Sequence, residues 1–439
     1  MMDDIKSKLE LIRKEREARS KSRRVSETWA RIQKEEDLST KEKLERLINL
    51  TREPREKKAP EPKFEPLSRE PLRVIENTYA LDARYGNVTL ASGLEISGEI
   101  LSCFSQDPAF RDLDLSTALF LDLETTGLSG GTGVVPFNVG MGFYRGDGFV
   151  VAQYFLGELA EEERMIQELA LFFKDMDFRS VVTYNGKGFD MPLLETRFIL
   201  YRQPFRIGSL PHLDFMYAAR KLWSHKYESC RLYNLALEVV RADRSEDIPS
   251  AEIPWRYFQY LQTGNPDLIE PVLYHNQEDI LSLLGAVIIG ALIFSEREDL
   301  PAGDAMDFFG AGRVMETFGD VERSIKFFQR ALSGNLPDEV TLEAKKRLSS
   351  YFKKNQEWEK AVPLWEEMTN SDVVTRAQLF SFRELAMYFE HKLKNYEQAR
   401  KIAEEGLVLS AGLSSFYERD FRYRLERLKR KIRRQKQEP

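Results

Sequence analysis

The sequence contains little cysteine: Cys103 and Cys230 are the only two among 439 residues. They lie far apart and lack the spacing of paired zinc ligands, so neither a disulfide framework nor a zinc site is indicated. Long hydrophobic runs are also missing, because the longest, residues 283–294, is too short to span a bilayer. The N-terminus lacks the apolar segment of a secretory signal. We therefore expect a protein of the reducing cytoplasm that does not enter a membrane.

An excess of positive charge is absent as well. The formal net charge is −6, although 31% of the residues are charged. A protein that binds any polyanion over its whole surface carries a strong positive charge, and this chain does not. A surface for nucleic acid would have to be local.

Changes in composition divide the chain into five segments. Residues 1–66 are dense in charge and end in a Pro-rich stretch, which predicts loosely packed helix or disorder followed by a linker. Residues 67–116 contain turn signals and predict a small lead-in β element. Strand and helix patterns alternate over 117–296, and the pattern is purely helical over 304–412. Residues 413–439 predict a basic helical tail with a solvated surface.

Segment 117–296 predicts an α/β fold with a mixed sheet. Its first part has three apolar strands joined by Gly-containing turns, which is typical of an antiparallel meander. Later helices are amphipathic or strongly apolar. The predicted strands are 117–124, 137–145, 149–157 and 180–186, and the principal predicted helices are 161–176 and 274–294.

The segment 304–412 contains a weak internal repeat of helix pairs. Ile325, Ala361 and Ala399 hold equivalent places, 36 and 38 residues apart. This pattern resembles tetratricopeptide repeats, whose period is about 34 residues. An irregular helical bundle is the alternative, because amphipathic helices readily imitate such repeats.

Asp122 and Glu124 interrupt an apolar strand. Because side chains alternate along a strand, both carboxylates point to the same side, where their charges repel each other unless a cation lies between them. Asp190 at the start of a helix, and Asp279 with His275 one turn before it, are the other acids in strongly apolar surroundings. Taken singly, Asp190 and Asp279 have the ordinary interpretation of helix-capping residues.

Taken together, the contexts "DLET", "NGKGFD" and "HNQED" resemble the DEDD nucleases, the DnaQ-like 3′-5′ exonucleases of the ribonuclease H-like fold. The match is closer to the YprB-like family, whose blocks stand here in order. They are "LETTGLSGG", "YNGKGFDMPLLETRF", "HLDFMYAARKLW", "ESCRLYNL", "EDIPSAEIPWRYFQYLQTGN" and "YHNQEDILSL". The resemblance implies a ribonuclease H-like mixed sheet with flanking helices, followed by an all-α helical repeat domain.

The resemblance also implies a metal site. Its four carboxylates correspond to Asp122, Glu124, Asp190 and Asp279, which would hold two Mg²⁺ or Mn²⁺ ions. The general base would be His275 or Tyr274, whose order is exchanged relative to the wider superfamily. We favour the histidine, because its ordinary pKa near 6.5 suits proton abstraction near neutral pH.

Residues around the acids are candidates for substrate contact. The resemblance assigns Thr125, Thr126 and Gly127 to the terminal nucleotide and Asn185 to the turn before the third acid. Lys187 would contact a phosphate, although a single lysine in a turn is more often solvated. Asp214 would orient the site, and a purely structural hydrogen bond is the alternative for it.

Three functional hypotheses follow. The first is a metal-dependent 3′-5′ exonuclease acting on single-stranded DNA or RNA. The second is a non-catalytic nucleic-acid-binding or scaffold protein that acts through its helical repeats. The third adds a protein partner bound on those repeats, which commonly form concave binding surfaces.

Overall fold

A six-stranded mixed sheet organises the first half of the computed structural model, which describes residues 70–127, 133–295 and 303–437. The prediction for residues 1–66 lies outside these ranges. The strand order is β1-β6-β5-β4-β7-β8. The strands are β1 (Leu72–Ala80), β4 (Ala118–Thr125), β5 (Pro136–Arg145), β6 (Gly148–Leu156), β7 (Ser180–Thr183) and β8 (His212–Asp214).

The antiparallel meander predicted from the sequence is present as β4, β5 and β6. β7 and β8 continue the sheet parallel to β4, so the sheet is mixed as predicted. β1 pairs antiparallel with β6 at the other edge, so the segment 67–116, predicted to be a separate lead-in element, contributes a strand to the sheet. That segment also forms the small hairpin β2 (Arg84–Tyr85) and β3 (Val88–Thr89).

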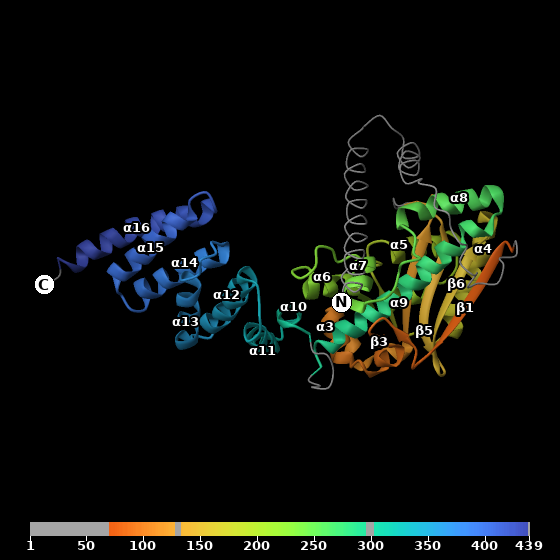
Figure 1. Ribbon diagram of the computed structural model, residues 1–439, viewed down its shortest axis with the longest axis horizontal. Helices are drawn as coiled ribbons and strands as arrows, with labels where there is room; N and C mark the ends of the chain where they lie inside the picture. The colour runs from red at the N-terminus through yellow and green to blue at the C-terminus, as the bar shows by residue number, and fades with distance from the viewer. Residues whose placement is uncertain (1–69, 128–132, 296–302, 438–439) are drawn as a thin grey trace, which may run out of the picture. The chain divides into compact units, whose positions relative to one another are not determined.

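Helices cover both faces of the sheet (Figure 1). One face carries α4 (Glu162–Asp175), α5 (Asp190–Leu200) and α8 (Ile253–Thr263), and the other carries α3 (Gly98–Ser105), α6 (Phe215–Trp223) and α9 (Glu270–Leu292). Shorter segments join them: α7 (Leu232–Leu235), the π-helical η6 (Ala236–Val240), and the 3-10 segments η1 (Leu90–Glu95), η2 (Pro108–Asp112), η3 (Leu115–Thr117), η4 (Leu159–Glu161), η5 (Arg206–Ser209), η7 (Ser250–Glu252) and η8 (Pro266–Leu268).

The alternation of side chains along β4 decides where its acids point. Leu119 and Leu121 are fully buried among the residues of α4 and α5, whereas Phe120 packs in the cluster that contains α9. Each buried leucine of this kind contributes about 1.5–3 kcal/mol to the free energy of folding. With a period of two, Asp122 and Glu124 lie on the side of Phe120. The packing of this strand therefore directs both carboxylates toward α9.

Helix α9 begins earlier than predicted. It starts at Glu270 with Pro271 in its first turn, a position that proline favours because its missing N–H needs no partner there. Asp279 consequently lies nine residues after the first residue of α9, so the alternative that it caps this helix is wrong. Asp190 is the first residue of α5, where the capping position belongs to Phe189.

Residues 303–437 are helical, as predicted. The helices are α10 (Ala305–Phe318), α11 (Val321–Leu332), α12 (Asp338–Lys354), α13 (Trp358–Thr369), α14 (Arg376–His391), α15 (Tyr396–Ser410) and α16 (Ser415–Gln435). Ala361 and Ala399 are fully buried in α13 and α15, and Ile325 is partly buried in α11. The three predicted helix pairs exist, and their assignment as tetratricopeptide repeats stays a prediction.

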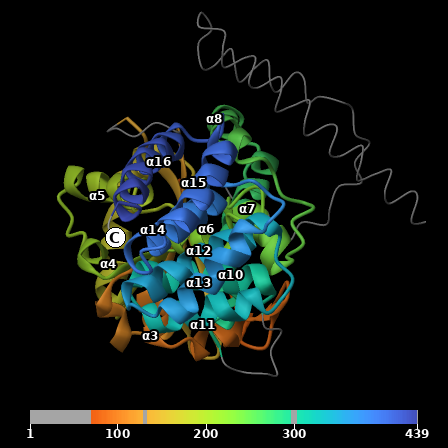
Figure 2. The same cartoon turned by 90° about the vertical axis from the view of Figure 1, so that its left-hand side faces the viewer.

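The basic tail is more than a solvated surface. α16 packs beside α15 and α14 (Figure 2) and buries Phe421 and Leu428 on one side. Buried Glu390 of α14 accepts hydrogen bonds from Arg427 and Arg424 of α16. The predicted basic tail is therefore a helix that is solvated on one side and packed against α14 and α15 on the other. No helix in the described ranges has the length and apolar character that crossing a bilayer requires.

Candidate active site

Asp122 in β4 is fixed by a polar side chain of α9. Its Oδ2 accepts a hydrogen bond of 2.8 Å from Nδ2 of Asn276. Gln153 of β6 in turn donates to Oδ1 of Asn276 over 2.9 Å, so the amide is held from both ends. The Asn276 amide lies so close over Gly140 of β5 that a Cβ atom there would collide with it. Glycine at this strand position is what lets the amide reach the carboxylate.

Three of the predicted metal ligands have raised pKa values. Burial raises the pKa of Asp122 well above its ordinary value, and the charges of Asp279 and Asp190 raise it further. Burial also raises the pKa of Glu124, followed by the charges of Asp122, Asp279 and Asp190. The pKa of Asp190 is raised to about 7 by burial and by the charge of Asp214. The charges of Asp190 in α5 and Asp279 in α9 therefore act on the two buried carboxylates of β4, Asp122 and Glu124, so the four acids lie near one another.

The donor chemistry of this cluster fits a divalent cation. Buried carboxylates that repel one another need a compensating positive charge, and hard ions such as Mg²⁺ and Mn²⁺ prefer carboxylate oxygens. As the side chains are placed, however, the described residues contain no group of three or more His, Cys, Asp or Glu residues arranged to hold an ion. The fit therefore rests on the chemistry and burial of the acids and not on a finished coordination sphere.

Arg244 binds the fourth acid. Its fully buried guanidinium places Nη1 2.5 Å from Oδ1 of Asp279, and Nη2 lies 2.5 Å from Oδ2 of Asp247. Burial opposes the charge of Arg244, but the two carboxylates outweigh that effect and raise its pKa. One of the four predicted metal ligands thus already has a cationic partner.

His275 is held by the same segment of chain. Its Nδ1 lies 2.7 Å from Oδ1 of Asp247, and its Nε2 lies 3.3 Å from Oγ of Ser250 and 3.6 Å from Oδ2 of Asp279. A carboxylate accepts hydrogen bonds, so Nδ1 donates to Asp247 and leaves Nε2 able to accept a proton. Burial lowers the pKa of His275, but the hydrogen bond with Asp247 and the charges of Asp279 and Asp247 together outweigh this, so its pKa is raised.

Tyr274 is the other candidate base. Burial and the charge of Glu278 raise its pKa to about 12, which moves the phenol further from ionisation at neutral pH. Nε2 of His275, by contrast, faces the acid cluster through Asp279.

The turn after β4 uses its hydroxyl groups internally. The Thr125 hydroxyl donates to the carbonyl of Gly127 over 2.8 Å, and the Thr126 hydroxyl accepts from the backbone N–H of Val135 over 3.0 Å. These bonds shape the turn, so Thr125 and Thr126 would meet a substrate mainly through the backbone. The residues that follow, 128–132, lie outside the described part of the chain. They include the "LSGG" of the block "LETTGLSGG".

Asp214 shapes the turn before the third acid. Its two carboxylate oxygens accept the backbone N–H groups of Asn185 at 2.8 Å and Lys187 at 3.1 Å, and it also caps α6 through the N–H of Met216. Asn185 takes a left-handed conformation with φ +68°, which asparagine tolerates better than most residues. The side chains of Asn185 and Lys187 are exposed, so both can reach a ligand.

Arg244, Asp247 and Asn276 were not predicted from the sequence as site residues. Asp247 lies within the block "EDIPSAEIPWRYFQYLQTGN", and Asn276 stands inside "HNQED", so both lie in segments that carried the resemblance. No periodicity or spacing marks Arg244, because its contact with Asp279 arises when the segment after η6 folds against α9.

The chain is similar to several known proteins. A family model described as the RNase_H superfamily matches residues 119–286, which span β4 to α9. A family B DNA polymerase from Pyrobaculum calidifontis aligns with 48% of this chain and 28% of its own length, at 19% identity and a TM-score of 0.33. The uncharacterized protein YprB of Bacillus subtilis (strain 168) is 33% identical over 369 residues, 82% of this chain and 86% of that protein.

The fold and the matched region therefore define a protein of the RNase H superfamily. Within it, the extent and identity of the match show that the chain belongs to the YprB-like family.

Proposed function

We propose that this protein is a metal-dependent nuclease that hydrolyses phosphodiester bonds, acting as a 3′-5′ exonuclease on single-stranded DNA or RNA. The observation that carries the proposal is the proximity of Asp122, Glu124, Asp190 and Asp279, because the charges of Asp190 and Asp279 raise the pKa values of buried Asp122 and Glu124. Membership of the RNase H superfamily supports nuclease chemistry. A protein that only needed a stable fold would gain nothing from four acids placed together.

The four acids would hold two Mg²⁺ or Mn²⁺ ions. When bound, such ions supply an activated water and relieve the charge that develops on the leaving oxygen. Asn276 orients Asp122, and Arg244 limits the negative charge that remains around Asp279. Asp214 sets the backbone turn that leads into Asp190.

His275 is the proposed general base, with Tyr274 as the alternative. The hydrogen bond from Nδ1 to Asp247 fixes the ring and directs Nε2 toward Asp279, where a proton from the attacking water would be taken. Asn185 and Lys187 would contact the substrate through exposed side chains, and Thr125, Thr126 and Gly127 through the backbone of their turn.

The test is degradation of oligonucleotides labelled at either end, both DNA and RNA, single- and double-stranded, in the presence of Mn²⁺ or Mg²⁺. Wild-type protein should release labelled products from single strands. Asp122→Asn should lower the rate of degradation by at least about 100-fold, because it removes a carboxylate that would hold the metal ions. Absence of degradation by wild type, or full activity in Asp122→Asn, would refute the proposal.

A non-catalytic nucleic-acid-binding or scaffold protein is the second candidate. The ion pair between Arg244 and Asp279 favours it, since a built-in cation replaces part of the charge that a metal ion would supply. This candidate predicts binding of single strands without degradation by wild type. The binding of a protein partner to the helical part stays a prediction.

A further inference from the structure

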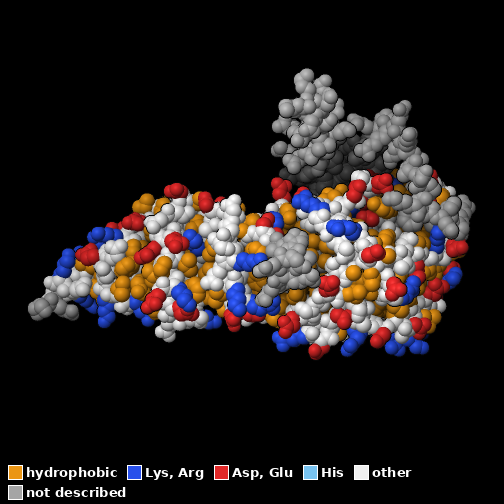
Figure 3. Space-filling view, turned by 60° about the horizontal axis from the view of Figure 1, so that its bottom comes forward, with side chains coloured by type: hydrophobic (Ala, Val, Ile, Leu, Met, Phe, Trp, Pro, Cys, Tyr) orange, Lys and Arg blue, Asp and Glu red, His pale blue; other side chains and the backbone are white. Residues whose placement is uncertain are grey.

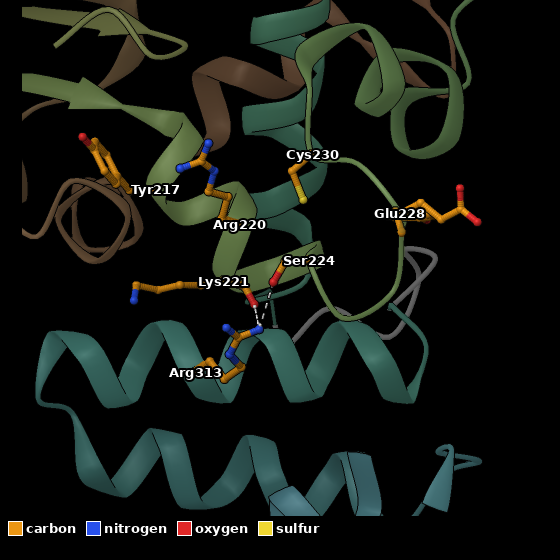
Figure 4. Close-up of a pocket in the computed structure, with 8 residues that line it drawn as sticks. Tyr217, Arg220, Lys221, Ser224, Glu228, Cys230 and Arg313 are labelled. Carbon is orange, nitrogen blue, oxygen red and sulfur yellow. Dashed lines mark hydrogen bonds between the residues drawn. The ribbon is translucent and has the colours of Figure 1, made fainter. Parts of the chain in front are cut away.

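A cavity of about 440 Å³ lies against α6 and α10 (Figure 4). None of the four acids of the candidate active site lines it. α6 contributes Tyr217, Arg220 and Lys221, and Ser224 follows directly after it; the four recur at helical spacing on the outward side. α10 contributes Arg313. We call these five residues the cationic cavity.

The cationic cavity has only partly compensated positive charge, because the carboxylates of Glu316 and Glu343 act on Arg313 without pairing with it. Within the described ranges, no carboxylate lies within ion-pair distance, 4.0 Å, of Arg220, Lys221 or Arg313. Burial and the nearby charge of Arg313 lower the pKa of Lys221, and burial and the charge of Arg347 lower the pKa of Arg313. The acid at the rim, Glu228, is exposed and extends away from the three cations in Figure 4.

Arg313 is held ready for a ligand. Its Nη1 lies 3.1 Å from the carbonyl of Lys221, 3.4 Å from Oγ of Ser224 and 3.2 Å from Nδ1 of His225. These contacts fix one nitrogen of the planar guanidinium, whose other donors suit the oxygens of a phosphate. Tyr217, half exposed at the rim, offers a ring on which a base can stack.

Helix α6 connects this cavity to the acid cluster. Asp214, which caps α6, also fixes the turn that precedes Asp190. Arg220 and Lys221 follow six and seven residues later, roughly 10 Å along the helix axis. That distance is of the order of a few nucleotides of a single strand.

We infer that the cationic cavity binds phosphate groups of the single-stranded nucleic acid whose end occupies the acid cluster. This inference rests on the proposed function and extends it, because it assigns a second contact region for the strand. On the face drawn in Figure 3, basic and acidic side chains are interspersed. A local cluster of cations without ion-pair partners is therefore where phosphate contacts add most to the affinity for a strand.

The test compares two double variants of the full chain in an Asp122→Asn background, which prevents cleavage. Arg220→Gln with Lys221→Gln changes the cavity. Arg164→Gln with Lys174→Gln removes two exposed cations from α4 on the other face of the sheet as a matched control. Fluorescence anisotropy with a labelled 12-nucleotide single strand measures affinity over a range of salt concentrations, and thermal melting checks folding.

The cavity variant should bind the strand roughly tenfold more weakly, and the slope of log affinity against log salt should become shallower by about 1.4, the value for two lost phosphate contacts. The control should match the parent. Equal affinity and slope in both variants would overturn the inference. If inorganic phosphate competes for the cavity while the cavity variant binds the strand as tightly as its parent, the cavity binds free phosphate. That result would also overturn the inference.

A separate readout keeps the two proposals apart. The cavity substitutions in otherwise wild-type protein should leave cleavage of a dinucleotide unchanged, since it is too short to reach the cavity, and should slow cleavage of the 12-nucleotide strand. If wild type degrades both substrates and the variants do not differ, the function stands and the cavity inference fails. If wild type degrades neither substrate, the proposed function fails, and anisotropy still reports on the cavity.

Discussion

At the scale of single residues, the site depends on side chains that hold the predicted ones in place. Asp247 accepts from Nδ1 of His275 and also contacts Arg244, so one carboxylate positions both the proposed base and the cation beside Asp279. Burial raises the pKa of Asp247, but the hydrogen bond with His275 and the charges of His275 and Arg244 together outweigh this, so its pKa is lowered. Residues of this kind carry little sequence signal, since their role exists only when distant segments meet.

Asp247→Asn should lower the rate of cleavage by about 100-fold while changing KM little, because the imidazole loses the acceptor that fixes its tautomer. Steady-state kinetics on an end-labelled strand measure both quantities. Asp267→Asn, an exposed acid in η8, is the matched control and should leave both unchanged. Equal rates for Asp247→Asn and wild type would remove His275 and its partner from the proposed mechanism.

At the scale of elements, the strands and helices that carry the acids could be predicted because their apolar patterns are strong. β4, β5, β6 and α4 agree with prediction to within one or two residues. β1 was missed as part of the sheet because it is an edge strand whose side chains alternate between partly buried and exposed. The start of α9 was missed because Pro271 was not recognised as a residue of its first turn.

The approach of α9 to β5 gives a second prediction. Gly140→Ala places a Cβ atom where the Asn276 amide lies, so the hydrogen bond to Asp122 is strained or lost. We expect a loss of about 1–3 kcal/mol in the free energy of unfolding, together with reduced activity. Urea unfolding and the cleavage assay measure the two effects.

Gly133→Ala is the control, because a Cβ atom at Gly133 meets nothing within 4 Å. If Gly140→Ala is as stable and active as Gly133→Ala, the packing of Asn276 on β5 does not determine the geometry of Asp122.

The contact of α14 with α16 predicts a dependence on pH. Burial opposes ionisation of Glu390, but hydrogen bonds from Arg427 and Lys431 outweigh it and lower its pKa below the ordinary 4.5. A carboxylate whose pKa is lower in the folded state stabilises the protein fully at pH values above its unfolded-state pKa. This stabilisation is lost as the pH falls through the folded-state pKa. Glu390→Gln should therefore destabilise the helical part at pH 7, by about 3 kcal/mol, and the deficit should shrink below pH 4.5.

Urea unfolding of wild type and Glu390→Gln between pH 7 and pH 3, followed by helical circular dichroism, measures this deficit. Glu404→Gln on α15 carries the same substitution at an exposed carboxylate paired with Arg400 and should change stability little at any pH. A deficit for Glu390→Gln that stays constant or grows as pH falls would contradict the assigned role of the Glu390 ion pairs.

At the scale of the whole molecule, an RNase H-like sheet and a helical part occur in one chain and contact each other through α6 and α10. Lys226 after α6 pairs with Asp304 and Asp307 at the start of α10, beside the cationic cavity. Family membership and the order of acid-bearing segments were visible in the sequence. The ring of contacts among Arg244, Asp247, His275 and Asp279 was not, because it joins residues of one loop and one helix that only packing brings together.

The central claim is that four acids on β4, α5 and α9 together hold divalent cations. Isothermal titration of Mn²⁺ into wild-type protein and into Asp122→Asn, with Asp267→Asn as the control acid, tests it most directly. We predict saturable binding by wild type and the control, accompanied by a rise in melting temperature, and a large loss of both in Asp122→Asn. Absence of binding by wild type, or equal binding by Asp122→Asn, would contradict the claim.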